Sequence, residues 1–116
     1  HSREEKSKGL AGSSMGVVGL ETSFAAVNTY MVEKGYISFE KLVEVMSINP
    51  RKIFGLESGI QIGKPADITI VDPKAKWAVN PEEFISMGKA TPFTGWQVHG
   101  KCMATVCDGK IAYLSK

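Results

Sequence analysis

The run Gly63-Lys64-Pro65-Ala66-Asp67-Ile68-Thr69-Ile70-Val71-Asp72 marks the point at which the character of the sequence changes. Its first three residues are typical of a turn. The β-branched residues that follow predict a strand over 67–72, which Pro73 would close. Asp108-Gly109 is typical of a two-residue hairpin turn. Four further short strands are predicted, at 76–79, 96–98, 103–106 and 110–113.

On the N-terminal side of this run, apolar residues repeat at helical spacing. A first helix is predicted over about 20–34, with Gly35 as its stop. Ser38 is a plausible N-cap for a second helix. We expect each helix to pack through one apolar stripe. The stripes are Leu20, Phe24, Val27 and Met31 in the first helix, and Phe39, Leu42, Val43 and Met46 in the second.

Two shorter helices are predicted from Asn-Pro pairs, because Asn caps a helix and Pro is tolerated at its first position. Asn49-Pro50 predicts a helix over 51–54 that ends at Gly55. Asn80-Pro81 predicts a brief helix that ends at Gly88. Helices followed by strands, without β-α-β alternation, predict an α+β fold.

The composition indicates a single globular domain. The chain has 116 residues, of which 43% are hydrophobic and 22% charged, and its formal net charge is +2. This charge is too small to suggest nucleic acid as a partner, and no apolar run approaches the roughly 20 residues of a membrane span. Cys102 and Cys107 lie five positions apart in a segment that reads as extended, so a bridge between them is not expected. We therefore expect reduced thiols in a cytoplasmic protein.

A search for a catalytic constellation finds none. His99 lies in a strand-like segment, which favours a packing or surface role, and no serine stands in a recognisable nucleophile motif. The glycine-rich stretch over 9–19 precedes the first helix. Its glycines either allow tight turns or let main-chain N–H groups approach an anion, and both interpretations stay open.

Several motifs in this order resemble class I dihydroorotases, which are cyclic amidohydrolases. They are His1 with Glu4-Glu5-Lys6, Gly16-Val17-Val18-Gly19-Leu20-Glu21-Thr22, Asn49-Pro50-Arg51-Lys52-Ile53-Phe54-Gly55-Leu56, residues 63–72, and Thr91-Pro92-Phe93-Thr94-Gly95-Trp96. The Asn-Pro and Gly-Lys-Pro-Ala-Asp motifs also fit hydantoinases. The segment 91–96, together with Gly-Leu-Glu-Thr, resembles dihydroorotase more specifically.

The resemblance implies that the chain is the C-terminal piece of a (β/α)8 barrel metallohydrolase. Residues 1–56 would be an active-site loop and helices of the barrel, and residues 57–116 would be half of a small β-sandwich. The parent enzyme would hydrolyse dihydroorotate reversibly to N-carbamoyl-aspartate in pyrimidine synthesis. It would use zinc, whose ligands lie upstream of His1, as does the proton-transferring aspartate. No catalytic or metal-binding residue is therefore expected in this chain, and the fragment alone would be inactive.

The resemblance also implies roles for three residues in binding the substrate. His1 would bind the substrate carboxylate, and Met15 and Gly16 would contact the substrate through their main chain. The expected partners are this substrate, the missing N-terminal part of the protein, further copies in a homo-oligomer, and aspartate transcarbamoylase. Two alternatives are a hydantoinase or dihydropyrimidinase, and a non-catalytic dihydroorotase-like subunit that scaffolds aspartate transcarbamoylase. Because barrel strands would be missing, we expect apolar surface to lie exposed.

Overall fold

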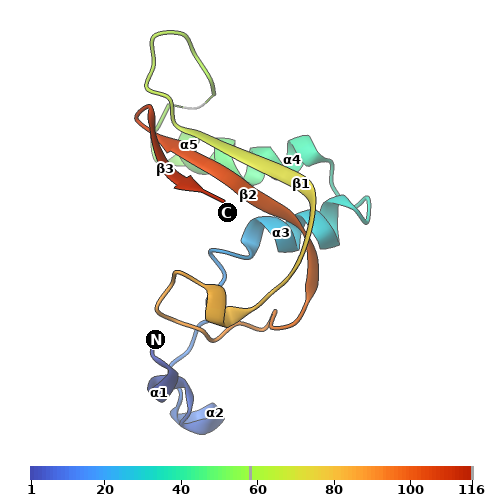
Figure 1. The fold of residues 1–116 in the computed structure, drawn as a ribbon, viewed down its shortest axis with the longest axis vertical. Coiled ribbons are helices and arrows are strands. Elements are labelled where there is room, and N and C mark those ends of the chain that lie inside the picture. Colours follow the sequence, from blue (N-terminus) through green and yellow to red (C-terminus); the bar gives the residue numbers. More distant parts are fainter. Residues whose placement is uncertain (58, 116) are drawn as a thin grey trace.

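The β-branched run after residue 67 forms the first strand of a three-stranded antiparallel sheet, with the order β1-β2-β3. The computed structural model describes residues 1–57 and 59–115, and within these residues the fold is α+β, as predicted (Figure 1). The strands are β1 (Ile68–Ala78), β2 (Gln97–Cys107) and β3 (Lys110–Leu114). The hairpin prediction is confirmed. Asp108 and Gly109 have φ values of 48° and 73°, the left-handed conformations that such a turn requires.

The sequence predicted short strands where the structure has long ones. Segments 67–72 and 76–79 join into β1, and the register of β1 against β2 shifts between Asp72 and Lys76. Pro73 lies in this irregular stretch, where a missing N–H interrupts no ladder bond. Segments 96–98 and 103–106 likewise join into β2 through Gly100, whose φ is 108°. The predicted breaks are therefore bends within continuous strands.

The helices follow the predicted order with shifted bounds. The first helix comprises α3 (Ser23–Val27) and the π turn η1 (Asn28–Val32), so it begins three residues later than predicted. The second comprises α4 (Phe39–Val43) and the π turn η2 (Glu44–Ile48), and the hydroxyl of its predicted cap Ser38 accepts from the N–H of Lys41 at 3.2 Å.

The third predicted helix, α5 (Asn49–Ile53), continues directly from η2. Asn49 is helical and does not cap it, so that prediction is wrong. The wider π turn leads into Pro50, whose ring would crowd the carbonyl group four residues back in an α-helix.

Only Phe24 of the first predicted stripe is shown against the sheet, where its ring lies beside Gly100 of β2. The structure buries Ala25, Asn28 and Thr29, whereas Leu20 is 86% exposed and lies outside the helix. Small and polar side chains are needed here because the helix approaches the backbone of β2 closely. A Cβ atom at Gly100 would lie 2.8 Å from a ring carbon of Phe24. In the second stripe, Leu42 is buried, while Val43 and Met46 remain partly exposed.

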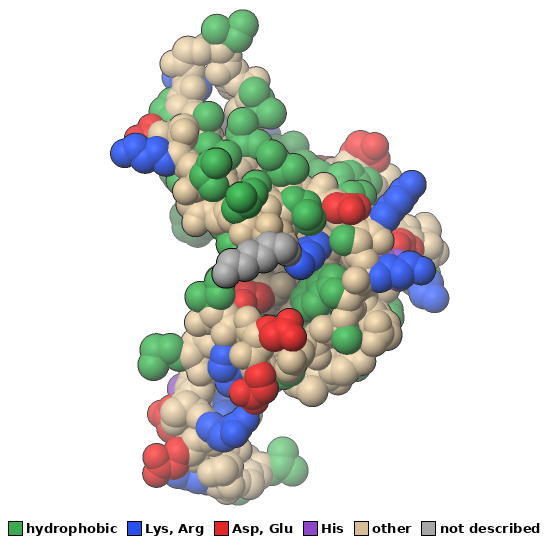
Figure 2. All heavy atoms as spheres, viewed as in Figure 1, with side chains coloured by type: hydrophobic (Ala, Val, Ile, Leu, Met, Phe, Trp, Pro, Cys, Tyr) green, Lys and Arg blue, Asp and Glu red, His purple; other side chains and the backbone are tan. Residues whose placement is uncertain are grey.

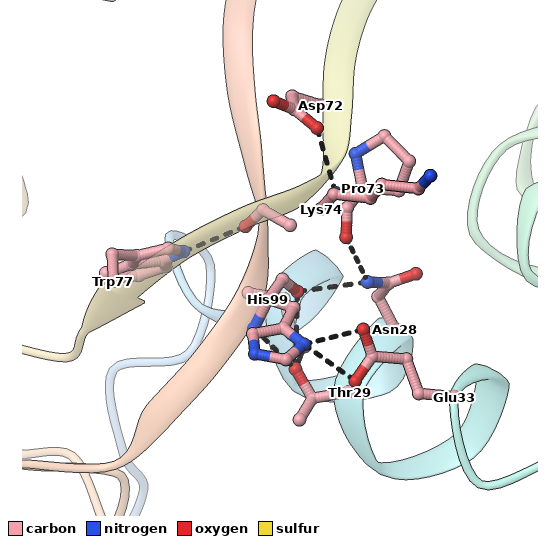
Figure 3. A network of polar contacts seen from close by, with 10 residues as sticks. Asn28, Thr29, Glu33, Asp72, Pro73, Lys74, Trp77 and His99 are labelled. Carbon is pink, nitrogen blue, oxygen red and sulfur yellow. Dashed lines mark hydrogen bonds and ion pairs between the residues drawn. The ribbon is translucent and has the colours of Figure 1, made fainter.

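A polar network fastens this helix to both bends of the sheet (Figure 3). The side-chain amide of Asn28 donates to the carbonyl oxygens of Pro73 at 2.9 Å and His99 at 3.1 Å. The hydroxyl of Thr29 accepts from the N–H of His99 at 2.7 Å. The imidazole Nδ1 of His99 lies 2.6 Å from a carboxylate oxygen of Glu33, so this histidine makes a structural contact near the surface, as predicted.

Short helices also lie near the N-terminus and between β1 and β2. Residues 1–19 contain α1 (Arg3–Lys6) and α2 (Gly9–Gly12), where only polar chain and loop were predicted. The helix predicted after Asn80 is a single 3-10 turn, η3 (Pro81–Glu83), and the side chain of Asn80 caps it as expected. Both cysteines are free thiols.

The chain is elongated and exposes much apolar surface. Its radius of gyration is 16.3 Å, whereas a compact domain of this length would have about 13 Å. Its accessible surface is 8581 Å², against roughly 6200 Å² for a compact monomer of this mass. Figure 2 shows hydrophobic side chains gathered over β1, β3 and the segment before β1. They include Ile60, Ile62, Ile70, Ile111 and Leu114.

Among residues 1–57 and 59–115, no helix has the length and apolar character needed to cross a membrane.

Candidate functional site

A cavity of about 180 Å³ lies where the glycine-rich stretch meets the segment that precedes β2. The structure brings all three sequence-predicted site residues, His1, Met15 and Gly16, to its wall. They come from two separate parts of the N-terminal region. The remaining lining residues are Lys6, Val17, Val18 and Ala90.

The first helical turn holds His1 at this cavity. Ser2 and Glu5 form a capping box, in which the Ser2 hydroxyl accepts from the Glu5 N–H at 3.1 Å and the Glu5 carboxylate accepts from the Ser2 N–H at 2.6 Å. The hydrogen bonds from Ser2 hold the pKa of Glu5 below its ordinary value. The ionised carboxylate lies 3.8 Å from Nδ1 of His1, whose side chain is 48% exposed. An imidazole in this position has an acidic neighbour and an open face toward a ligand.

The main chain around Met15 and Gly16 is available to a ligand. Met15 lines the cavity and is 87% exposed. Gly16 has a φ of 95°, in the left-handed region that favours glycine. Within the described part of the chain, the N–H groups of Met15, Gly16 and Val17 donate to no protein acceptor. Unpaired N–H groups beside an imidazole suit an anionic group.

Lys6 is a site residue that sequence reasoning missed. Its ammonium group donates to the main-chain carbonyl oxygens of Ser14 and Gly16. Its own carbonyl oxygen accepts from the Ser13 hydroxyl at 2.9 Å. Lys6 lies in a charged and polar stretch, residues 1–8, for which the sequence predicted no helix, so no local pattern signalled these contacts.

The segment that precedes β2 forms the back of the site. The Val18 N–H donates to the Ala90 carbonyl oxygen at 2.8 Å. The Glu21 carboxylate accepts from the N–H groups of Ile85 at 2.9 Å and Ser86 at 3.0 Å. Partial burial acts to raise the pKa of Glu21, but the hydrogen bonds from Ser86 and Ile85 outweigh it, so the net shift is downward. These contacts hold the end of the glycine-rich stretch, hereafter the loop, against residues 85–90, which lie some seventy positions later in the chain.

Gly88 allows the close contact between the loop and this segment. A Cβ atom at position 88 would lie 2.7 Å from a methyl carbon of Val18 and 3.5 Å from the carbonyl oxygen of His1. A β-branched valine has little rotamer freedom to withdraw. Glycine at this position therefore sets how closely the loop approaches the back of the site.

The donor set does not fit the zinc that the resemblance implies for the parent enzyme. A zinc site takes at least three protein ligands from His, Cys, Asp and Glu. Across the described ranges, no three such side chains lie together. The residues of this cavity are suited to bind an organic anion, and they do not form a metal centre.

Residues 6–112 match the amidohydrolase family, and the chain belongs to this family of hydrolases that act on C–N bonds. It is 42% identical over 113 residues to the dihydroorotase of Thermoanaerobacter sp. (strain X514) and 40% identical over 114 residues to that of Bacillus thuringiensis (strain Al Hakam). The resemblance to dihydroorotases is thereby confirmed. Each alignment covers 97% of this chain but only 26% or 27% of the relative, so the chain spans about a quarter of their length.

Solved structures of hydantoinases share the fold. The L-hydantoinase of Arthrobacter aurescens superposes on 90% of this chain and 24% of its own, with a TM-score of 0.81 and 36% identity. The D-hydantoinase of a Thermus species superposes on 98% of this chain and 26% of its own, with a TM-score of 0.85. Its identity is 22%, so this second likeness concerns the fold alone.

Proposed function

We propose that this chain is the C-terminal part of a dihydroorotase and supplies the corner of the active site that binds the substrate carboxylate. Residues 1–56 would contribute the loop and helices of a barrel, and residues 57–116 would contribute half of a β-sandwich. The zinc ligands and the proton-transferring aspartate would lie in the remainder of the enzyme. The chain on its own would therefore bind no metal and have no activity.

The cavity is the observation that carries this proposal. His1, Met15 and Gly16 all line it, and the N–H groups of Met15, Gly16 and Val17 have no protein acceptor among the described residues. Dihydroorotate carries a carboxylate that must be recognised while its ring amide is hydrolysed. Hydrogen-bond donors of this kind bind a carboxylate without bringing a second full charge into the site. This chain thus holds and orients the substrate, while the bond-breaking groups reside elsewhere.

The open surface supports the view that further polypeptide covers this chain. The accessible surface exceeds that of a compact monomer by roughly 2400 Å², about three times what one partner buries in a standard interface. Leu20, Ile85 and Met87 are among the large apolar side chains left exposed. A barrel and the other half of a β-sandwich would cover such faces.

A hydantoinase is the second candidate, because the L-hydantoinase of Arthrobacter aurescens is 36% identical over most of the chain. The cavity separates the two candidates by charge. Hydantoin and dihydrouracil lack the carboxylate of dihydroorotate, so they would leave the imidazole and the N–H donors of this wall without a partner. The 40–42% identity to dihydroorotases over 97% of the chain also favours dihydroorotase.

The test is to express the complete reading frame that contains residues 1–116 and to assay it with dihydroorotate, dihydrouracil and hydantoin in parallel. We expect zinc-dependent ring opening of dihydroorotate and little turnover of the two neutral rings. Faster turnover of hydantoin or dihydrouracil would replace the proposal by the hydantoinase alternative. A complete protein that binds no zinc and opens none of the three rings would support a non-catalytic subunit instead.

A further inference from the structure

We propose that Lys6 is a positioning residue, which turns two peptide groups of the loop so that the N–H groups of Met15 and Val17 are presented to the substrate carboxylate. The inference rests on the proposed function of the cavity. It concerns a residue that has no place in the sequence-predicted set of His1, Met15 and Gly16.

The geometry of the peptide groups carries the argument. The Ser14 carbonyl group belongs to the same peptide plane as the Met15 N–H, and the Gly16 carbonyl group shares its plane with the Val17 N–H. The described peptide bonds are all trans, so within each plane the C=O and N–H groups point in opposite directions. Since the Lys6 ammonium group donates to both carbonyl oxygens, both N–H groups point away from it.

Those two N–H groups are left without a protein acceptor among the described residues, and Met15 and Val17 both line the cavity. In the 14–15 and 16–17 peptide groups, the carbonyl oxygen is therefore held by the Lys6 ammonium group, and the N–H group is left without a protein acceptor. A positive charge on a carbonyl oxygen also polarises its peptide group, which strengthens the N–H as a donor. The result is a pair of donors suited to the two oxygens of one carboxylate.

The backbone of Lys6 is fixed as well. Lys6 is half-buried and is the last residue of α1, the turn that the Ser2–Glu5 capping box stabilises. Its carbonyl oxygen accepts from the Ser13 hydroxyl. Lys6 thus binds the glycine-rich stretch twice. Its main chain contacts Ser13, and its ammonium group contacts the carbonyl groups of Ser14 and Gly16. A flexible surface lysine would not define peptide orientations in this way.

The experiment compares three variants of the complete enzyme in steady-state kinetics with dihydroorotate. Lys6→Met removes the charge and the donors, Lys6→Arg keeps both, and Lys8→Met is the matched control. Lys8 is an exposed lysine of the same segment, and its side chain makes no hydrogen bond or ion pair within residues 1–57 and 59–115.

For Lys6→Met we expect KM to rise roughly 10- to 150-fold, the range for losing one hydrogen bond to a charged group. We expect kcat to stay within about threefold, because the carboxylate is bound equally in the ground state and the transition state. Lys6→Arg should recover most of the lost affinity, and Lys8→Met should match the wild type.

Three outcomes would overturn the inference. The first is a wild-type KM in Lys6→Met, and the second is an equal rise in KM for Lys8→Met. The third is a crystal structure of Lys6→Met with dihydroorotate in which the 14–15 and 16–17 peptide groups keep their orientation. The last result would assign Lys6 to direct contact with the substrate or to general stability. Failure of the proposed function is distinguishable, because the wild-type enzyme itself would then not open dihydroorotate.

Discussion

Replacing Asn28 by alanine removes the side-chain amide that joins the first helix to two bends of the sheet. Asn28 is 2% exposed, and its amide nitrogen donates to the carbonyl oxygens of Pro73 at 2.9 Å and His99 at 3.1 Å. The His99 carbonyl oxygen still has the Thr29 hydroxyl at 3.3 Å, a donor that it shares with the Ala25 carbonyl oxygen at 2.7 Å. The Pro73 carbonyl oxygen has no second side-chain donor among the described residues, so the substitution leaves it without a side-chain hydrogen bond.

The expected change in the free energy of unfolding follows from the different environments of these two carbonyl oxygens. Loss of a hydrogen bond to a group that keeps another partner costs about 1 kcal/mol, and a part-buried acceptor such as the Pro73 carbonyl oxygen costs at most about 1–3 kcal/mol when left unsatisfied. We therefore expect Asn28→Ala to lower the free energy of unfolding by about 2–4 kcal/mol. At about 4 °C per kcal/mol for a chain of this size, Tm should fall by roughly 8–16 °C.

Thermal and urea unfolding of the 116-residue chain, followed by tryptophan fluorescence, measures this effect. Trp77 is a suitable reporter because its indole N–H donates to the Gly100 carbonyl oxygen at 2.9 Å, beside the network. Asn49→Ala is the matched control, since Asn49 is also a helical asparagine at the border of a π turn, but its side chain makes a single 3.3 Å bond to Glu44. It should lower stability by less than about 1 kcal/mol. Equal effects of the two substitutions would refute the reasoning.

Four further predictions concern the site and the open surface. In the complete enzyme, His1→Ala should raise KM for dihydroorotate roughly 10- to 150-fold with zinc content unchanged, whereas Met15→Leu should be nearly silent. Zinc loss in the first variant, or a large defect in the second, would contradict these roles. Gly88→Ala should lower stability by about 1–3 kcal/mol and raise KM, because its Cβ has no room, while Gly19→Ala meets no atom within 4 Å and should not. Because the pKa of Glu21 is lowered in the folded state, the stability that it contributes is present above its ordinary value of 4.5 and is lost as the pH falls through the folded-state value. Acid unfolding should therefore be less steep for Glu21→Gln than for the wild type. Light scattering should find the 116-residue chain self-associated through its exposed apolar surface, and a clean monomer would argue against missing polypeptide.

Local signals predicted the elements of this fold well. Asp108-Gly109 specified the hairpin, and Ser38 specified a helix start, because in both cases the chemistry of one or two residues determines the backbone. The continuous strands were missed because Pro73 and Gly100 usually end strands, and only pairing across the sheet keeps them inside β1 and β2.

The packing face of the first helix could not be predicted from periodicity. Apolar spacing indicated Phe24, Val27 and Met31, but beside Phe24 the helix buries Ala25 and Asn28, while Met31 is 40% exposed. The helix meets backbone carbonyl groups at the bends of the sheet, so small size and hydrogen bonding decide the contact. Neither property is visible in a hydrophobic pattern.

The site was predicted in part. The resemblance indicated His1, Met15 and Gly16, and the structure places all three around one cavity. Their role in binding a substrate stays a prediction. Lys6 and Gly88 were missed because their contacts, with the loop carbonyl groups and with Val18, arise from the tertiary fold.

The hydrogen bonds that join Val18 and Glu21 to residues 85–90 have a consequence for folding kinetics. The Val18–Ala90 and Glu21–Ser86 contacts close chain segments of about 65–72 residues. Such long closures are entropically costly and form late, after local helices and the β2–β3 hairpin. The loop therefore acquires its final position only when the connection between β1 and β2 has folded. A nascent or truncated chain that ends before residue 85 would carry His1, Met15 and Gly16 and still lack the complete cavity that they line.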